Sequence, residues 1–166
     1  VSFPEAPTIK DSNQATPDVI ESALTAEETI SGPSEYEVMR TNSIAKKNRA
    51  IQTKLEKVIS YTKQTMVAYM SEEDLNRLCT YVAEYSSGDT LQKITPVKVD
   101  SQLKSIDIMH FGWNIGKAFG IKRIHTATFI KNVFAHTLRD LEISTIERKM
   151  SHTESECYIK LQQLKE

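Results

Sequence analysis

The chain has 166 residues, of which 39% are hydrophobic, and a formal net charge of −1 at pH 7. This length and apolar content suffice for one mid-sized domain or two small domains with a hydrophobic core. No run approaches the roughly 20 apolar residues that a membrane-spanning helix needs, so we expect no membrane segment. The two cysteines have no CxxC or Cys/His partner nearby, so a disulfide is possible but unsupported, and a reducing cytoplasm is the expected location.

The charges are distributed unevenly along the chain. Residues 1–37 carry eight acidic side chains and one basic, whereas residues 38–70 carry seven basic side chains and one acidic. Such asymmetry in a nearly neutral chain indicates either a pairing of the two segments or a basic surface that contacts a partner. A basic helix face that is merely solvated is the third interpretation, because charge patterning constrains solubility more than function.

Residues 1–35 are predicted to be an acidic, proline-containing arm or linker. The arm is too polar to fold alone, so we expect it to lie across a basic or apolar groove of this chain or of a second copy. Exposed ion pairs contribute only about 0–1 kcal/mol each, so apolar side chains must supply most of the binding. The expected anchors are Phe3, Ile9, Val19, Ile20 and Leu24.

Residues 36–100 are predicted to hold a pair of helices and a trailing loop. Apolar residues recur at three- and four-residue intervals from 36 to 70 without Gly or Pro, which predicts one long helix. Ser71, followed by three acidic residues, predicts the start of a second helix that ends near Gly88. Residues 91–99 contain Pro96 and are predicted to be a loop or an edge-like extended segment.

Residues 101–166 are predicted to form a three-helix unit, so the predicted fold is an all-α helical bundle. The first of these helices runs from about residue 101 to 119 and ends at Gly120. The second runs from about residue 126 to 138. The third begins at Ser144, where Ser-x-x-Glu predicts a capping box, and its apolar pattern continues to the C-terminus.

No motif in the sequence predicts catalysis, a cofactor or a metal. Residues 112–118 lack the spacing, the hydroxyl residue and the preceding strand of a phosphate-binding loop, so close helix packing explains Gly112 and Gly116 better. The four histidines lack metal-binding spacing and are predicted to be exposed or half-buried. Trp113 shares a helical face with other apolar residues and is predicted to lie in the core. No pair of groups suits acid–base or nucleophilic chemistry, so we expect a non-enzymatic protein.

Two helix pairs in residues 101–166 are candidates for a helix-turn-helix. With Gly120 as the turn glycine, the surrounding packing positions fit except Thr126, where an apolar residue is expected. In the alternative, the last two helices form the pair through residues 139–142. The last helix then presents basic residues near its N-terminus, as recognition helices do.

The predicted function is that of a non-enzymatic nucleic-acid-binding or regulatory protein that presents a capped basic helix, with double-stranded DNA as the expected partner. Arg suits guanine edges, and Lys and Thr suit phosphates. Four glutamates flank the helix and would repel phosphates, namely Glu142, Glu147, Glu154 and Glu156. The expected nucleic-acid-binding residues are Lys122, Arg123, Thr145, Arg148 and Lys149. The alternative is a helical protein–protein interaction or assembly module that uses the long basic helix or the arm. Convergence of the basic residues on one face favours DNA binding, whereas pairing with the glutamates favours the alternative.

Three segments have a pattern found in a family of regulators: IDIMHF at 106–111, FIKNVF at 129–134 and ISTIERKM at 143–150. Through these three segments, residues 103–164 resemble the RteC family of regulators from Bacteroidetes conjugative transposons. The resemblance implies an all-helical protein of a mobile element, with an N-terminal helical domain and a winged-helix-like, DNA-binding C-terminal domain. The acidic arm lies outside it.

Overall fold

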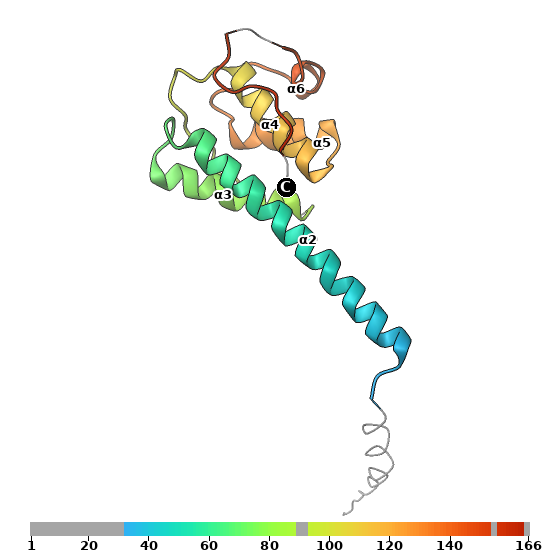
Figure 1. Ribbon diagram of the computed structural model, residues 1–166. Coiled ribbons are helices and arrows are strands. Elements are labelled where there is room, and N and C mark those ends of the chain that lie inside the picture. Colours follow the sequence, from blue (N-terminus) through green and yellow to red (C-terminus); the bar gives the residue numbers. More distant parts are fainter. Residues whose placement is uncertain (1–31, 89–92, 154–155, 165–166) are drawn as a thin grey trace, which may run out of the picture. The chain divides into compact units, whose positions relative to one another are not determined.

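The chain is all-α in the part that the structure describes, which confirms the predicted fold class. The structure is a computed structural model that describes residues 32–88, 93–153 and 156–164 (Figure 1). These ranges contain five α-helices and no β-strand. The chain divides into two compact units, residues 1–47 and 48–166. The predicted contacts of the arm fall on residues 1–31, outside the described residues.

The described part of the first unit is residues 32–34 and the N-terminal half of helix α2 (Glu35–Met66). A capping box starts this helix. Glu37 N donates to Ser34 Oγ at 3.1 Å, and Ser34 N donates to the Glu37 carboxylate at 3.1 Å. All side chains of residues 32–44 are exposed, so this half of α2 has no core among the described residues.

In the second unit, the rest of α2 is followed by helix α3 (Glu72–Ser86). Here α2 buries Val58, Thr62 and Met66, which are spaced by one helical turn, and it ends four residues before the predicted end. The predicted start of α3 is confirmed, because Ser71 Oγ accepts a hydrogen bond from Asp74 N at 3.2 Å. Residues 93–104 contain neither helix nor strand, so the described part of the predicted segment 91–99 is a loop, and the loop extends into residues 101–104, which were predicted to be helical.

Helices α4 (Ser105–Phe119), α5 (Arg123–Val133) and α6 (Ile143–Lys149) follow (Figure 1). Helix α5 contacts both α4 and α6. The predicted end of α4 is confirmed, because Gly120 has φ 72°, a left-handed conformation that glycine adopts without steric cost. The helix begins four residues later than predicted, where the Asp107 carboxylate accepts from Lys104 N at 2.9 Å.

The predicted role of Gly112 and Gly116 in helix packing is confirmed. A Cβ at Gly112 would lie 2.9 Å from two side-chain carbons of Ile130, and a Cβ at Gly116 would lie 2.6 Å from Thr126 Oγ1. Both neighbours belong to α5, so the two glycines allow α4 and α5 to approach closely. Trp113 is partly buried and packs against the core, as predicted.

The last predicted helix is wrong in its extent. Helix α6 has seven residues, its N-cap is Glu142, and no side chain caps it, so the predicted capping box at Ser144 does not start it. Residues 156–164, which we call the C-terminal strap, lie across α4 without helical structure. The strap is not helical because side chains of α4 bind its backbone, and these long-range hydrogen bonds compete with helical ones.

Candidate functional site

The five residues predicted to bind nucleic acid lie on α5 and α6. Lys122 is the N-cap of α5 and Arg123 is its first residue, and both are exposed. Thr145 is half-buried on α6, whereas Arg148 and Lys149 are exposed. The predicted position of the last two near the start of their helix is wrong, because α6 is short and they lie in its last turn.

Arg123 joins the start of α5 to the end of α6. Its Nη2 donates to the carbonyl oxygens of Glu147 at 2.5 Å and Arg148 at 3.4 Å, and its Nη1 donates to Ser151 Oγ at 3.2 Å. A guanidinium at this place satisfies carbonyls that have no partner inside the helix and interacts favourably with the helix dipole. The contact brings Lys122 and Arg123 close to the basic end of α6.

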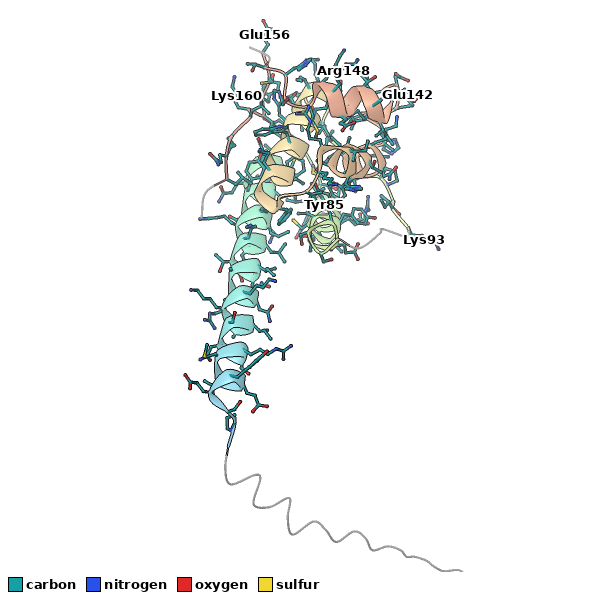
Figure 2. The ribbon with its side chains drawn as sticks, turned by 90° about the vertical axis from the view of Figure 1, so that its right-hand side faces the viewer. Tyr85, Lys93, Glu142, Arg148, Glu156 and Lys160 are labelled. Carbon is teal, nitrogen blue, oxygen red and sulfur yellow. The ribbon has the colours of Figure 1, made fainter. Side chains whose placement is uncertain are left out.

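Of the acidic residues expected to oppose phosphate binding, Glu147 lies in the last turn of α6 beside Arg148 and Lys149. Glu142 and Arg148 lie at opposite ends of α6 (Figure 2). Within the described residues, neither Glu142 nor Glu147 forms an ion pair with any of the five predicted residues. Of the two criteria, the structure gives a contact between Arg123 and the last turn of α6, and among the described residues it gives no ion pair between these two glutamates and the predicted residues.

A further charge pattern, readable in the sequence, was not used in the prediction. Residues 108–139 contain five Lys or Arg residues and no Asp or Glu. This stretch forms most of α4, the turn and all of α5. An acid-free stretch of this length makes the surface around α5 favourable for a polyanion.

The turn between α4 and α5 is the shorter of the two candidate helix-turn-helix connections. It comprises Gly120, Ile121 and Lys122, and Ile121 N donates to Gly116 O at 2.9 Å. A three- or four-residue turn with glycine is typical of the helix-turn-helix motif. The connection from α5 to α6 spans residues 134–142 and is longer.

Thr126, which counted against this turn in the sequence, has a packing role. Its side chain is buried, and its Oγ1 hydrogen-bonds to the Tyr85 hydroxyl and donates to Lys122 O at 3.2 Å. Burial raises the pKa of Tyr85 to about 12, partly offset by the bond to Thr126, so the phenol stays neutral at pH 7 (Figure 2). A hydroxyl with both partners satisfied can replace an apolar side chain at this position.

Lys131, the other Lys or Arg residue of α5, forms hydrogen bonds within the protein. Its Nζ donates to the carbonyl oxygens of Leu138, Arg139 and Leu141 at 2.9, 3.1 and 2.5 Å. These bonds hold the connection from α5 to α6. Lys122, Ile124 and His125 are the exposed residues at the start of α5 that a partner can contact.

A second set of polar side chains, on α4, binds the C-terminal strap. Asp107 Oδ1 accepts from Tyr158 N at 2.6 Å and from Ile159 N at 3.0 Å. Asn114 Nδ2 donates to Lys160 O at 2.8 Å, and its Oδ1 accepts from Gln162 N at 2.8 Å. Both side chains are almost fully buried, so α4 supplies the hydrogen bonds that a neighbouring strand would otherwise supply.

His110 lies between these two residues on the same face of α4. Its Nδ1 is 2.8 Å from Ile159 O, and its Nε2 is 2.6 Å from His152 O. The prediction that the histidines are exposed or half-buried is wrong for His110, which is 1% exposed. No spacing rule finds this contact, because its partners lie more than 40 residues away in the sequence.

Three observations complete the description of the site. In the described ranges, no group of three or more His, Cys, Asp or Glu residues is placed to hold a metal ion. None of the described helices combines the length and the apolar character that crossing a membrane requires. No family model, no curated protein and no solved structure matches this chain.

Proposed function

We propose that the chain is a non-enzymatic, regulatory protein that binds double-stranded DNA. The proposed interface is the start of α5 together with the end of α6. Its residues are Lys122, Arg123, Thr145, Arg148 and Lys149.

The observation that carries this proposal is the contact of Arg123 with the last turn of α6. It gathers two pairs of consecutive basic residues at one end of the α5–α6 pair, and Arg148 and Lys149 make no ion pair within the described residues. Non-specific affinity for DNA comes mainly from such cations, which displace counterions from phosphates.

The geometry of α4, the turn and α5 supports a recognition role for α5. Residues at the start of a recognition helix contact base edges, and Lys122, Ile124 and His125 are exposed there beside Arg123, whose guanidinium bonds to the end of α6. Arg148 and Lys149 are then suited to the phosphates beside the groove. The resemblance of residues 103–164 to the RteC regulators is in keeping with DNA binding and with a mobile element.

We expect the double variant Lys122→Ala/Lys149→Ala to bind mixed-sequence duplex DNA on the order of a hundredfold more weakly at low salt. The dependence of log affinity on log salt should become shallower by about two, because two phosphate contacts are lost. Fluorescence anisotropy across a salt series measures both quantities. Neither ammonium makes a described hydrogen bond, so the melting temperature should stay within a few degrees.

The matched control is Lys93→Ala/Lys98→Ala, which removes the same charge from two exposed residues of the loop 93–104. It should change DNA affinity only slightly. Equal losses in both double variants would show a general charge effect. The absence of salt-dependent DNA binding by the wild-type chain would refute the proposal.

A second candidate function, a protein–protein interaction or assembly module, rests on exposed apolar side chains of the first unit. Tyr36, Met39 and Ile44 are 62%, 62% and 45% exposed, and they line one shallow hollow along α2. Exposed apolar side chains grouped in this way mark contact sites for proteins. The partner would be a second copy or another protein, engaged through α2 or through the arm, residues 1–35.

If the partner is a second copy, sedimentation velocity should give the wild-type chain a mass above that of one chain, or a mass that rises with concentration. Met39→Glu/Ile44→Glu should then shift it to the monomer, because buried charge is costly. Thr41→Glu/Asn42→Glu adds the same charge at exposed positions and should leave the mass unchanged. A wild-type monomer at all concentrations excludes self-assembly.

A further inference from the structure

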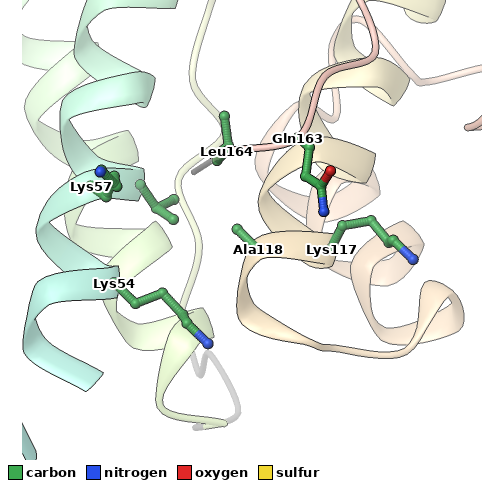
Figure 3. A pocket seen from close by; sticks show the side chains of 7 residues that line it. Lys54, Lys57, Lys117, Ala118, Gln163 and Leu164 are labelled. Carbon is green, nitrogen blue, oxygen red and sulfur yellow. The ribbon is translucent and has the colours of Figure 1, made fainter. Parts of the chain in front are cut away.

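A cavity in the second unit is lined by three lysines. Lys54 and Lys57 come from α2, Lys117 comes from α4, and the end of the C-terminal strap closes a third side (Figure 3). The cavity has a volume of about 230 Å³. The other lining residues are Val58, Ala118, Gln163 and Leu164.

All charged side chains among the described lining residues of this cavity are positive. No Asp or Glu is among its described lining residues, and none of the three lysines forms an ion pair in the part of the chain that the structure describes. The ammonium groups of Lys54 and Lys117 lie at the edge of the cavity and point in different directions (Figure 3). The positive charge around the cavity attracts an anion, and the flexible four-carbon stem of lysine lets an ammonium group turn toward it.

The nearest carboxylate on α2 does not compensate these charges. Glu56 lines an adjoining hollow rather than this cavity, and its Oε2 accepts a hydrogen bond from Gln52 Nε2 at 3.1 Å. Glu56 is the only acidic residue between residues 38 and 70. The three ammonium groups therefore have no carboxylate partner among the described residues.

The three lysines differ in their surroundings, and Lys117 is exposed. Lys54 and Lys57 are partly buried. Lys117 Nζ lies 5.5 Å from the centroid of the Trp113 ring, a cation–π contact that orients the ammonium. Apolar side chains, namely those of Val58, Ala118 and Leu164, line the same cavity.

We propose that this cavity binds a phosphate group. Lysine recognises phosphate as a point charge, and three lysines from two helices match its spread of negative charge. The volume is below the roughly 300–1,000 Å³ of pockets for drug-sized ligands, so the ligand is small or enters by its phosphate alone. Its source is either a small phosphorylated molecule or the backbone of a nucleic acid, and the second source rests on the proposed DNA binding.

The strap couples this site to the rest of the fold. Gln163 and Leu164 line the cavity, and Asn114 holds the residues just before them through Lys160 O and Gln162 N. The cavity is therefore complete only when the strap is bound to α4. A ligand that binds only this state stabilises it, so it should slow hydrogen exchange in the strap.

The test is a titration of the full chain with inorganic phosphate and with a nucleoside monophosphate, by calorimetry and by thermal melting at constant ionic strength. The wild type should bind and its melting temperature should rise relative to chloride. Lys54→Met/Lys117→Met keeps the aliphatic stems and should weaken binding by on the order of tenfold per lysine. Lys46→Met/Lys63→Met removes the same charge at exposed positions of α2 outside the cavity, so it is the matched control and should bind as the wild type does.

A short DNA duplex in the same assays separates the two sources. Loss of phosphate binding with unchanged DNA affinity supports a small phosphorylated ligand, whereas parallel loss of both supports a backbone phosphate. Equal behaviour of the wild type and Lys54→Met/Lys117→Met toward all three probes overturns the proposal, provided circular dichroism shows both folded. The DNA-binding proposal fails separately, through Lys122→Ala/Lys149→Ala, because the two sets of lysines do not overlap.

Discussion

Asp107→Ala is expected to lower the free energy of unfolding by about 3 kcal/mol or more. The variant leaves three backbone N–H groups without their acceptor, those of Lys104, Tyr158 and Ile159. The bond to Ile159 is buried and the other two are partly buried, and a buried N–H group without a partner costs about 1–3 kcal/mol. Release of the strap lets water reach these groups and limits the loss. Urea unfolding followed by circular dichroism measures the change, and hydrogen exchange at residues 156–164 measures the release.

Two further variants show which bonds are responsible. Asp107→Asn keeps one carbonyl oxygen for the two strap amides but turns an amide NH₂ toward Lys104 N, so a smaller loss of about 1 kcal/mol is expected. Asp140→Ala removes an exposed carboxylate whose ion pair with Arg139 is 4.0 Å long, and it should cost less than 0.5 kcal/mol, roughly. Wild-type hydrogen exchange in the strap of Asp107→Ala would contradict the role given to this residue.

Gly116→Ala is expected to destabilise the protein by about 1–3 kcal/mol, although alanine favours helix by roughly 1 kcal/mol over glycine. The added Cβ would lie 2.6 Å from Thr126 Oγ1 and 3.3 Å from the Tyr85 hydroxyl oxygen. Both atoms are held by their hydrogen bond to each other, so neither can move without losing it. Overpacking therefore outweighs helix propensity. Thermal unfolding of the variant gives the sign and the size of the effect.

A double-mutant cycle with Thr126→Ala isolates the clash. Thr126→Ala alone removes the bond to Tyr85, but in the Gly116→Ala background it also removes the atom that meets the new Cβ. The double variant should therefore be more stable than the sum of the two single effects predicts, by about 1 kcal/mol. Strict additivity, or a Gly116→Ala variant more stable than the wild type, would mean that α4 and α5 have room for the extra carbon.

The candidate DNA interface was only partly predictable from the sequence. Basic residues at 122–123 and 148–149 are visible in the sequence, and so is the absence of Asp and Glu from residues 108–139. Their approach to one another depends on bonds of Arg123 to residues 24 and 25 positions away, which no local pattern encodes. The three-lysine cavity could not be predicted from the sequence either, because its lining residues come from α2, α4 and the strap, which lie far apart in the sequence.

The sequence by itself determined the all-α class and those helix ends that have a local signal. Ser71 caps α3 through its own side chain, and Gly120 ends α4 because glycine adopts a left-handed conformation without steric cost. These signals act within a few residues of the helix end, so a single chain segment contains all the information.

Only the tertiary structure decided the form of the C-terminal strap, residues 156–164. Their apolar spacing predicts a helix, but Asp107, His110 and Asn114 bind the backbone of this segment from α4. These three side chains would lose their partners if the segment were helical, and a buried polar group without a partner is costly. Long-range hydrogen bonds therefore override local helix propensity in the strap, and the sequence shows the competing residues without showing that they meet.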